Sequence, residues 1–149
     1  MELPLADRLA IEELTARYNH AADLAPETWP DYFTADGVFE AGPEPRLLIE
    51  GRDALRRHAG VLAARTVPGR HWTNNAVIRG ESDAATQSCY LVMYRVDYPP
   101  FPIRMGVYRD TLARVGGEWR FKERRLTYIT ALNETEQEAE RARLLSLEG

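Results

Sequence analysis

The sequence predicts a single α+β domain in which helices cover one face of a long, curved sheet. Two patterns support this fold class. The first half of the chain places apolar residues at helical spacing, and the second half contains four successive runs rich in aromatic and β-branched residues. A length of 149 residues is typical of one domain, so we expect one compact core and no linker.

The first predicted helix has a clear apolar stripe. Ile11, Leu14, Tyr18 and Ala22 recur at helical spacing, with charged residues on the other side, and Pro26 ends the helix. Turn residues then separate further short elements. In order, the first half is predicted to contain a helix over residues 7–23, a short helix over 27–33, strands over 38–41 and 47–50, and a helix from 52 to about 64.

The second half predicts an antiparallel meander of four strands. Residues 80–83 and the Gly116-Gly117 pair have the composition of hairpin turns. The YPPFP segment at 98–102 predicts a loop, because proline cannot donate to a strand ladder. The predicted strands cover residues 71–79, 86–97, 104–115 and 118–130, and the acidic-to-basic order of residues 133–149 predicts a C-terminal helical tail.

Composition excludes several classes of function. The chain has 19 basic and 23 acidic residues, a formal charge of −4, which disfavours nucleic acid and anionic membranes as partners. The N-terminus has no pattern of a signal peptide or a membrane span, and the single cysteine, Cys89, lies in an apolar run that predicts a buried, inert thiol. We therefore expect a cytoplasmic protein.

No cofactor or metal site is expected. Phosphate-binding glycine loops and the GxSxG motif are absent from the sequence. His20 and His58 lie on predicted helices, and neither combines with His71 and an acid at a spacing typical of metal sites. Acid–base chemistry by side chains needs neither a cofactor nor a metal ion.

Five segments occur in a characteristic order along nearly the whole chain: AIEELTARYNHAAD, WPDYFTADGVFE, GRDALRRH, RHWTNNAVI and GVYRDTLARVGGEWRFKERRLTYI. Together they resemble the nuclear transport factor 2-like (NTF2-like) superfamily, and within it the SnoaL-like and scytalone-dehydratase-like branch. The resemblance implies a cone-shaped fold. In this fold a strongly curved mixed or antiparallel sheet wraps around N-terminal helices and encloses an apolar cavity that is open at one end.

The resemblance also implies a catalytic site. The dehydratases pair an aspartate at the end of the first helix with a histidine on a central strand, and these positions match Asp23 and His71. The bile-acid dehydratase subgroup adds a tyrosine, which Tyr18 matches. His71 would be the principal base or acid, Asp23 would orient it and stabilise its charged form, and Tyr18 would donate to a substrate oxygen. The structural alternatives are that Asp23 caps a turn and that His71 is a core imidazole.

Several further residues are candidates for substrate binding. Alternation along the strand at 71–79 predicts that Thr73 and Asn75 share the face of His71, and that Ile78 lies on the opposite face. Aromatic residues around an apolar pocket could bind a ligand or simply fill the core. The candidates are Asn75, Thr73, Tyr90, Tyr94, Tyr108, Trp29, Phe33, Phe39 and Met93.

The match to the dehydratases is partial. Met93 or its neighbours stand where the bile-acid subgroup places an acid, Tyr128 stands where it places an arginine, and no second histidine follows His71. The related epoxide hydrolases use an Asp-Arg-Asp relay. Asp110 with Arg124 or Arg125 fits that relay poorly, and a structural ion pair between neighbouring strands explains these residues better.

Taken together, the sequence predicts a cofactor-independent acid–base enzyme that acts on a small hydrophobic hydroxylated or carbonyl compound. A dehydratase (lyase) is the leading prediction, followed by an isomerase or a polyketide-type cyclase. The alternative is a non-catalytic ligand-binding or assembly protein, such as a small subunit resembling that of the aromatic-ring dioxygenases. In either case we expect a homodimer or homotrimer.

Overall fold

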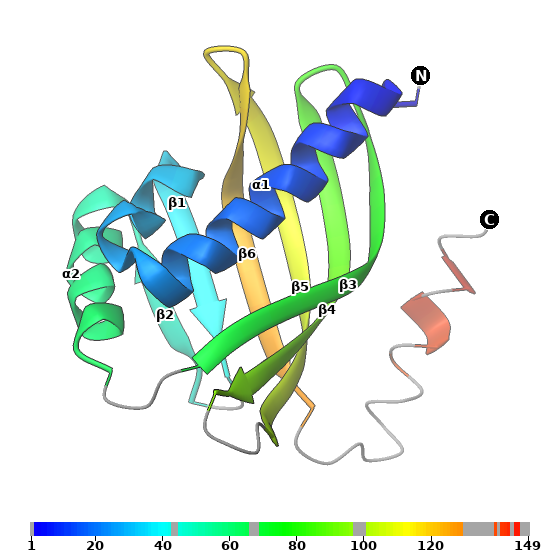
Figure 1. Ribbon diagram of the computed structural model, residues 1–149. Coiled ribbons are helices and arrows are strands. Elements are labelled where there is room, and N and C mark those ends of the chain that lie inside the picture. The colour runs from blue at the N-terminus through cyan, green and yellow to red at the C-terminus, as the bar shows by residue number, and fades with distance from the viewer. Residues whose placement is uncertain are drawn as a thin grey trace.

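The computed structural model describes residues 2–42, 45–65, 69–96 and 101–129, together with residues 139, 141–143, 145 and 146 of the tail. Helices lie against one face of a single curved sheet (Figure 1). The elements are α1 (Leu5–Leu24), the 3₁₀ helix η1 (Pro26–Tyr32), β1 (Phe33–Ala41), β2 (Leu47–Glu50), α2 (Arg52–Ala63), β3 (Gly69–Glu81), β4 (Ala84–Arg95), β5 (Phe101–Val115) and β6 (Glu118–Tyr128).

The sheet is mixed, and its strand order differs from the order of the chain. The strands lie in the order β2-β1-β6-β5-β4-β3. β1 runs parallel to β6, whereas the other neighbouring pairs are antiparallel. α1 crosses the sheet diagonally, and α2 stands beside the β1–β2 end (Figure 1). The predicted α+β class with a curved, mixed sheet is confirmed.

The core fills the space between the helices and the sheet. The predicted inward stripe of α1 is buried at Ile11, Leu14 and Tyr18, and that of α2 at Leu55 and Leu62. Full burial of such a side chain contributes roughly 1.5–3 kcal/mol, so these two stripes hold the helices in place. Their partners include Trp29 of η1 and, in the sheet, Phe33, Leu91, Tyr108, Leu112 and Phe121.

The hairpin between β5 and β6 follows the predicted turn. Gly116 and Gly117 have φ values of 58° and 82°, the left-handed conformations that a two-residue turn between antiparallel strands requires. Of the loop predicted over 98–102, residues 98–100 lie outside the described residues. Phe101 and Pro102 belong to β5, and Pro102 pairs with Tyr94, so the prediction of a loop at these two residues is wrong. The register shifts at this point, and such an irregularity tolerates a residue without an N–H donor.

A β-bulge in β3 changes the predicted alternation. Asn74 pairs with Tyr90 and Val77 pairs with Ser88, so β3 contains one extra residue in this interval. Asn75 adopts φ 56° at the bulge. As a result Ile78 returns to the inner face and is buried, while Val77 is exposed; the prediction that Ile78 lies opposite His71 is wrong.

The C-terminal prediction is tested only in part. Residues 139, 141–143, 145 and 146 are helical, and the rest of the tail predicted over 133–149 lies outside the described residues. In the described chain no helix combines the length and apolar character needed to cross a membrane.

Candidate active site

Asp23 and His71 form a close pair between the last turn of α1 and the start of β3. The His71 backbone N–H donates to Asp23 Oδ2 at 3.0 Å, and His71 Nδ1 lies 2.5 Å from Asp23 Oδ1. The side chain of His71 is only 9% exposed and that of Asp23 only 5%. Both carboxylate oxygens are therefore engaged by one residue, which holds the imidazole ring in a single orientation. The turn-capping alternative for Asp23 does not describe this geometry.

The pair also determines which ring nitrogen carries the hydrogen. A carboxylate only accepts hydrogen bonds, so His71 Nδ1 is the donor, and in the neutral imidazole Nε2 then keeps its lone pair. Among the described residues no group forms a hydrogen bond with Nε2. A neutral imidazole held in this way can remove a proton from a bound molecule, and the carboxylate stabilises the cation that results.

Asp23 and His71 line a large pocket. Its volume is about 1200 Å³, which is sufficient for a ring-containing molecule. It lies between the end of α1, the second half of α2 and the ends of β3, β4 and β5 that meet there. The described lining comprises Ala22, Asp23, Leu24, Pro26, Arg57, Gly60, Val61, Leu62, Ala63, Ala64, Arg65, Gly69, Arg70, His71, Met93, Ile103 and Arg104.

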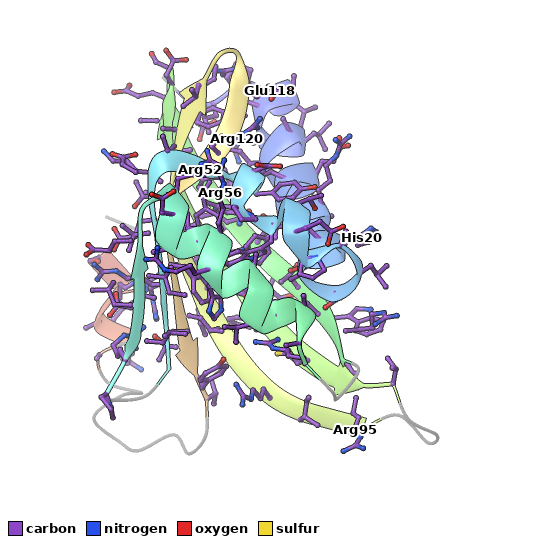
Figure 2. All side chains as sticks on the ribbon, turned by 90° about the vertical axis from the view of Figure 1, so that its left-hand side faces the viewer. His20, Arg52, Arg56, Arg95, Glu118 and Arg120 are labelled. Carbon is purple, nitrogen blue, oxygen red and sulfur yellow. The ribbon has the colours of Figure 1, made fainter. Side chains whose placement is uncertain are left out.

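A smaller pocket lies on the β3 side of α1. It has a volume of about 340 Å³, and its lining includes Asn19, His20 and Thr73 as well as the Asp23–His71 pair. His20 itself is exposed and points away from the body of the protein (Figure 2). The pair therefore borders two spaces, of which the larger has room for a substrate.

A polar seam on α1 positions Asp23. Thr15, Asn19 and Asp23 are spaced by four residues, so they lie along one face of the helix. The Asn19 amide donates to Thr73 Oγ1 at 2.9 Å. Gln87 donates to Thr15 Oγ1 at 2.8 Å. With the Asp23–His71 contact, these bonds tie three successive turns of α1 to the sheet. The four-residue spacing of polar residues was a signal in the sequence that the analysis of apolar residues missed.

Tyr18 lies apart from this pair. Its side chain is 2% exposed and its ring packs against Trp29, Phe33 and Phe121. Burial raises the pKa of its phenol, so the hydroxyl stays protonated. Tyr18 does not line either pocket described above. The structure thus brings Asp23 and His71 together and leaves Tyr18 in the core.

Asp110 and Arg124 form a second, fully buried pair. Arg124 Nε and Nη2 donate to the two oxygens of Asp110 at 3.0 and 3.1 Å, and Gln87 adds a third donor at 2.9 Å. The guanidinium also stacks on the Tyr108 ring at 3.7 Å. Burial opposes the charge of Arg124, but attraction to Asp110 outweighs it and raises the pKa of Arg124. The predicted cross-strand ion pair is confirmed, with Arg124 rather than Arg125 as the partner.

The other candidates for substrate binding are scattered. Met93 lines the large pocket and Thr73 the small one. Asn75 is exposed at the bulge, Tyr90 is 49% exposed on the opposite face of the sheet, and Tyr94 packs on Trp72. The remaining candidates are buried in the core: Trp29, Phe33, Phe39 and Tyr108.

The sequence analysis missed four arginines. Arg57, Arg65, Arg70 and Arg104 line the large pocket but come from three separate parts of the chain. Only the tertiary structure brings them together, and no spacing pattern in the sequence indicated it. The described residues contain no group of three or more histidine, cysteine, aspartate or glutamate side chains arranged to hold a metal ion. Cys89 is buried, as predicted, and burial raises its pKa to about 11.

The SnoaL-like domain family matches residues 4–125. The chain is a SnoaL-like protein. It therefore belongs to the NTF2-like superfamily, as the order of its sequence segments predicted. The match spans α1 through most of β6 and so includes both Asp23 and His71.

Solved structures share the fold of this SnoaL-like protein. A variant of a function-unknown protein from Mycobacterium tuberculosis is 32% identical over 85% of this chain and 74% of that chain, with a TM-score of 0.77. A candidate scytalone dehydratase from Novosphingobium aromaticivorans is 24% identical over 85% and 86%, with a TM-score of 0.74. The beta subunit of a candidate aromatic-ring-hydroxylating dioxygenase from the same organism is 23% identical over 87% and 94%, with a TM-score of 0.73. The last two show the fold alone, and no match was found among the curated proteins.

Proposed function

We propose that this SnoaL-like protein is a cofactor-independent acid–base enzyme that dehydrates a small hydroxylated carbonyl compound. One observation carries the proposal: His71 is held by both oxygens of Asp23, with Nε2 left without a partner among the described residues, at the wall of a pocket of about 1200 Å³. The candidate scytalone dehydratase with the same fold is consistent with this reaction.

The proposed reaction uses the neutral imidazole of His71, with its lone pair on Nε2, as the base. His71 Nε2 removes a proton from the carbon next to the substrate carbonyl, and the electrons of that C–H bond form the new C=C bond. The C–O bond on the neighbouring carbon breaks, and the leaving hydroxide takes the proton from Nε2. The products are an unsaturated carbonyl compound and water, and His71 returns to its neutral form. Asp23 stabilises the imidazolium between the two transfers, and each proton transfer contributes roughly 10²- to 10⁴-fold in rate.

The pocket walls suggest how a substrate is held. Leu62, Met93 and Ile103 supply apolar surface for its carbon skeleton. Tyr18 has no part in this proposal, because its ring is packed in the core. The same base would also catalyse isomerisation through an enolate if the substrate had no leaving hydroxyl.

The experiment uses exchange of the proton next to a carbonyl, because this step needs only the base. A panel of β-hydroxyketones in D₂O is followed by NMR, which detects both deuterium uptake and the new C=C bond. We expect the wild type to catalyse both with one panel member and His71→Ala to lose both while it stays folded by circular dichroism. His20→Gln is the matched control and keeps the activity. Exchange that persists in folded His71→Ala would show that His71 is not the base.

A second candidate function is assembly, and an exposed apolar row on the outer face of the sheet favours it. Trp72 of β3 pairs with Val92 of β4, which pairs with Met105 of β5. Trp72 and Met105 are 57% and 50% exposed. We propose that this row joins copies of the chain in a homodimer or homotrimer. Light scattering tests it: Trp72→Arg should yield monomers, whereas Leu9→Arg, at a similarly exposed site on α1, should not. A monomeric wild type would contradict it.

A further inference from the structure

We infer that the large pocket binds a molecule that carries a carboxylate, and that Arg57, Arg65 and Arg70 recognise this group. The inference deepens the proposed function and rests on the same pocket. It adds a charged anchor to a substrate that the sequence had indicated to be merely hydrophobic. Binding of the anchor can be measured without any turnover, so the two proposals can fail separately.

The pocket has an unusual balance of charge. Arg57 comes from the middle of α2, Arg65 from the residues after that helix, Arg70 from the start of β3, and Arg104 from β5. Asp23 is the only acidic residue in the described lining, and both its oxygens are engaged by His71. The chain as a whole has a formal charge of −4. The local excess of positive charge is thus opposite in sign to the charge of the protein.

The pocket arginines also differ from most other described arginines because they have no acidic side chain as an ion-pair partner among the described residues. Most other described arginines pair with a carboxylate, for example Arg17 with Glu13, Arg46 with Glu40, Arg52 with Asp31, Arg114 with Asp7 and Arg120 with Glu118. Within the described residues, none of the four pocket arginines forms an ion pair with an acid. Surface arginines in this chain thus find acidic partners on most of the protein, and those around the pocket do not.

The pocket arginines keep donors that a ligand could use. Arg70 Nη1 donates to the Gly69 carbonyl at 2.9 Å, and Arg104 Nη1 donates to the Tyr128 hydroxyl at 3.0 Å. For Arg57 and Arg65, no side-chain hydrogen bond forms within the described residues. A guanidinium has five N–H donors in a planar fork that matches a carboxylate, and Arg70 is partly buried, which limits screening by water.

The proposed reaction also limits where on the substrate the carboxylate can lie. A negative charge directly on the carbon acid would oppose removal of its proton, so the carboxylate is an anchor remote from the reacting carbon. The apolar residues Leu62, Val61 and Ile103 line the pocket and would contact the part of the substrate between its reacting carbon and its carboxylate. The ligand class is therefore a hydroxylated carbonyl compound with an apolar body and a carboxylate at the other end.

The test compares two probes of the same shape, 2-naphthoate and the uncharged 2-naphthamide. Binding to the wild type is measured by NMR titration at about 20 mM salt, where screening is weak. We expect naphthoate to bind at least ~10-fold more tightly than naphthamide, because charge-assisted hydrogen bonds to a guanidinium are about twice as strong as neutral ones. The difference should shrink as salt is added.

Charge-matched variants locate the anchor. Arg57→Gln and Arg70→Gln should each weaken naphthoate binding by about 5- to 10-fold and leave naphthamide binding unchanged. Arg56→Gln removes the same charge from the neighbouring position of α2, but Arg56 is not among the described residues that line the pocket, and it pairs with Asp53. It should bind both probes like the wild type.

Two outcomes would overturn the inference: equal affinity of the wild type for both probes, or equal losses in Arg56→Gln and Arg57→Gln. Neither outcome affects the assignment of His71. Conversely, His71→Ala should still bind naphthoate more tightly than naphthamide. If the wild type shows this preference but catalyses no α-proton exchange, only the proposed reaction is contradicted, and the carboxylate site stands. Circular dichroism of each variant confirms that it is folded.

Discussion

Two acid–base pairs of this protein, Asp110–Arg124 and Asp23–His71, differ in what surrounds them. Asp110–Arg124 is enclosed on all sides, with both side chains 0% exposed. Asp23–His71 is nearly as buried, yet it borders a pocket and leaves one ring nitrogen without a partner among the described residues. The same kind of contact is therefore structural where every donor faces the core, and suited to catalysis where one group can reach a bound molecule.

The largest effect on stability is expected from Asp110→Asn. The amide cannot neutralise Arg124, which is then left as a buried charge without an ionised partner. Loss of one member of a buried ion pair costs roughly 3–5 kcal/mol of the free energy of unfolding. Urea unfolding measures it. A change below about 1 kcal/mol would mean that the core is far more permeable to water than the structure indicates.

The same substitution in the Asp23–His71 pair, Asp23→Asn, should lower the rate of the proposed reaction more than the stability of the protein. In Asp23→Asn the amide nitrogen donates, so Nδ1 must accept and the hydrogen moves to Nε2, which can no longer serve as a base. We expect α-proton exchange to fall by about 10²- to 10⁴-fold and the free energy of unfolding by only about 1 kcal/mol. If stability fell as much as in Asp110→Asn, the distinction between the two pairs would fail.

The polar seam on α1 should have an intermediate effect that sharpens this comparison. Asn19→Ala removes the contact with Thr73 that lies one helical turn before Asp23. We expect a loss of roughly 1–2 kcal/mol in the free energy of unfolding. A double-mutant cycle with Thr73→Val isolates the pair, and its coupling energy should be about 0.5–1.5 kcal/mol. A coupling near zero would show that the seam does not hold the helix.

The smallest effect concerns pH. Burial, followed by the charge of Arg65, lowers the pKa of His58 from its ordinary value of 6.5. The imidazole of His58 then binds a proton more readily in the unfolded chain than in the folded one. The contribution of neutral His58 to stability is therefore fully present above its unfolded pKa and is lost as the pH falls through its lower, folded pKa. His58→Leu should reduce the loss of thermal stability on acidification, whereas His20→Gln should not. An unchanged pH profile in His58→Leu would contradict this.

Much of the fold could be predicted from the sequence. Strand β2 over Leu47–Glu50 matches its predicted range, and the Gly116-Gly117 turn occurs where its residues require left-handed backbone. Such elements depend on neighbouring residues along the chain. The bulge at Asn75 was not predictable in this way, because it depends on how β3 pairs with β4. The residues of β3 alone do not determine its register with β4, so they do not indicate where the bulge lies.

The sequence by itself determined the α+β class and the two helical stripes, which are consequences of periodicity and turn chemistry. The order of its segments indicated the superfamily, and this resemblance in turn implied that Asp23 and His71 belong together. Only the tertiary structure decided that Tyr18 lies in the core, that Arg124 rather than Arg125 pairs with Asp110, and that unpaired arginines surround the pocket. Each of these depends on distances between residues far apart in the chain, which follow from packing and strand register.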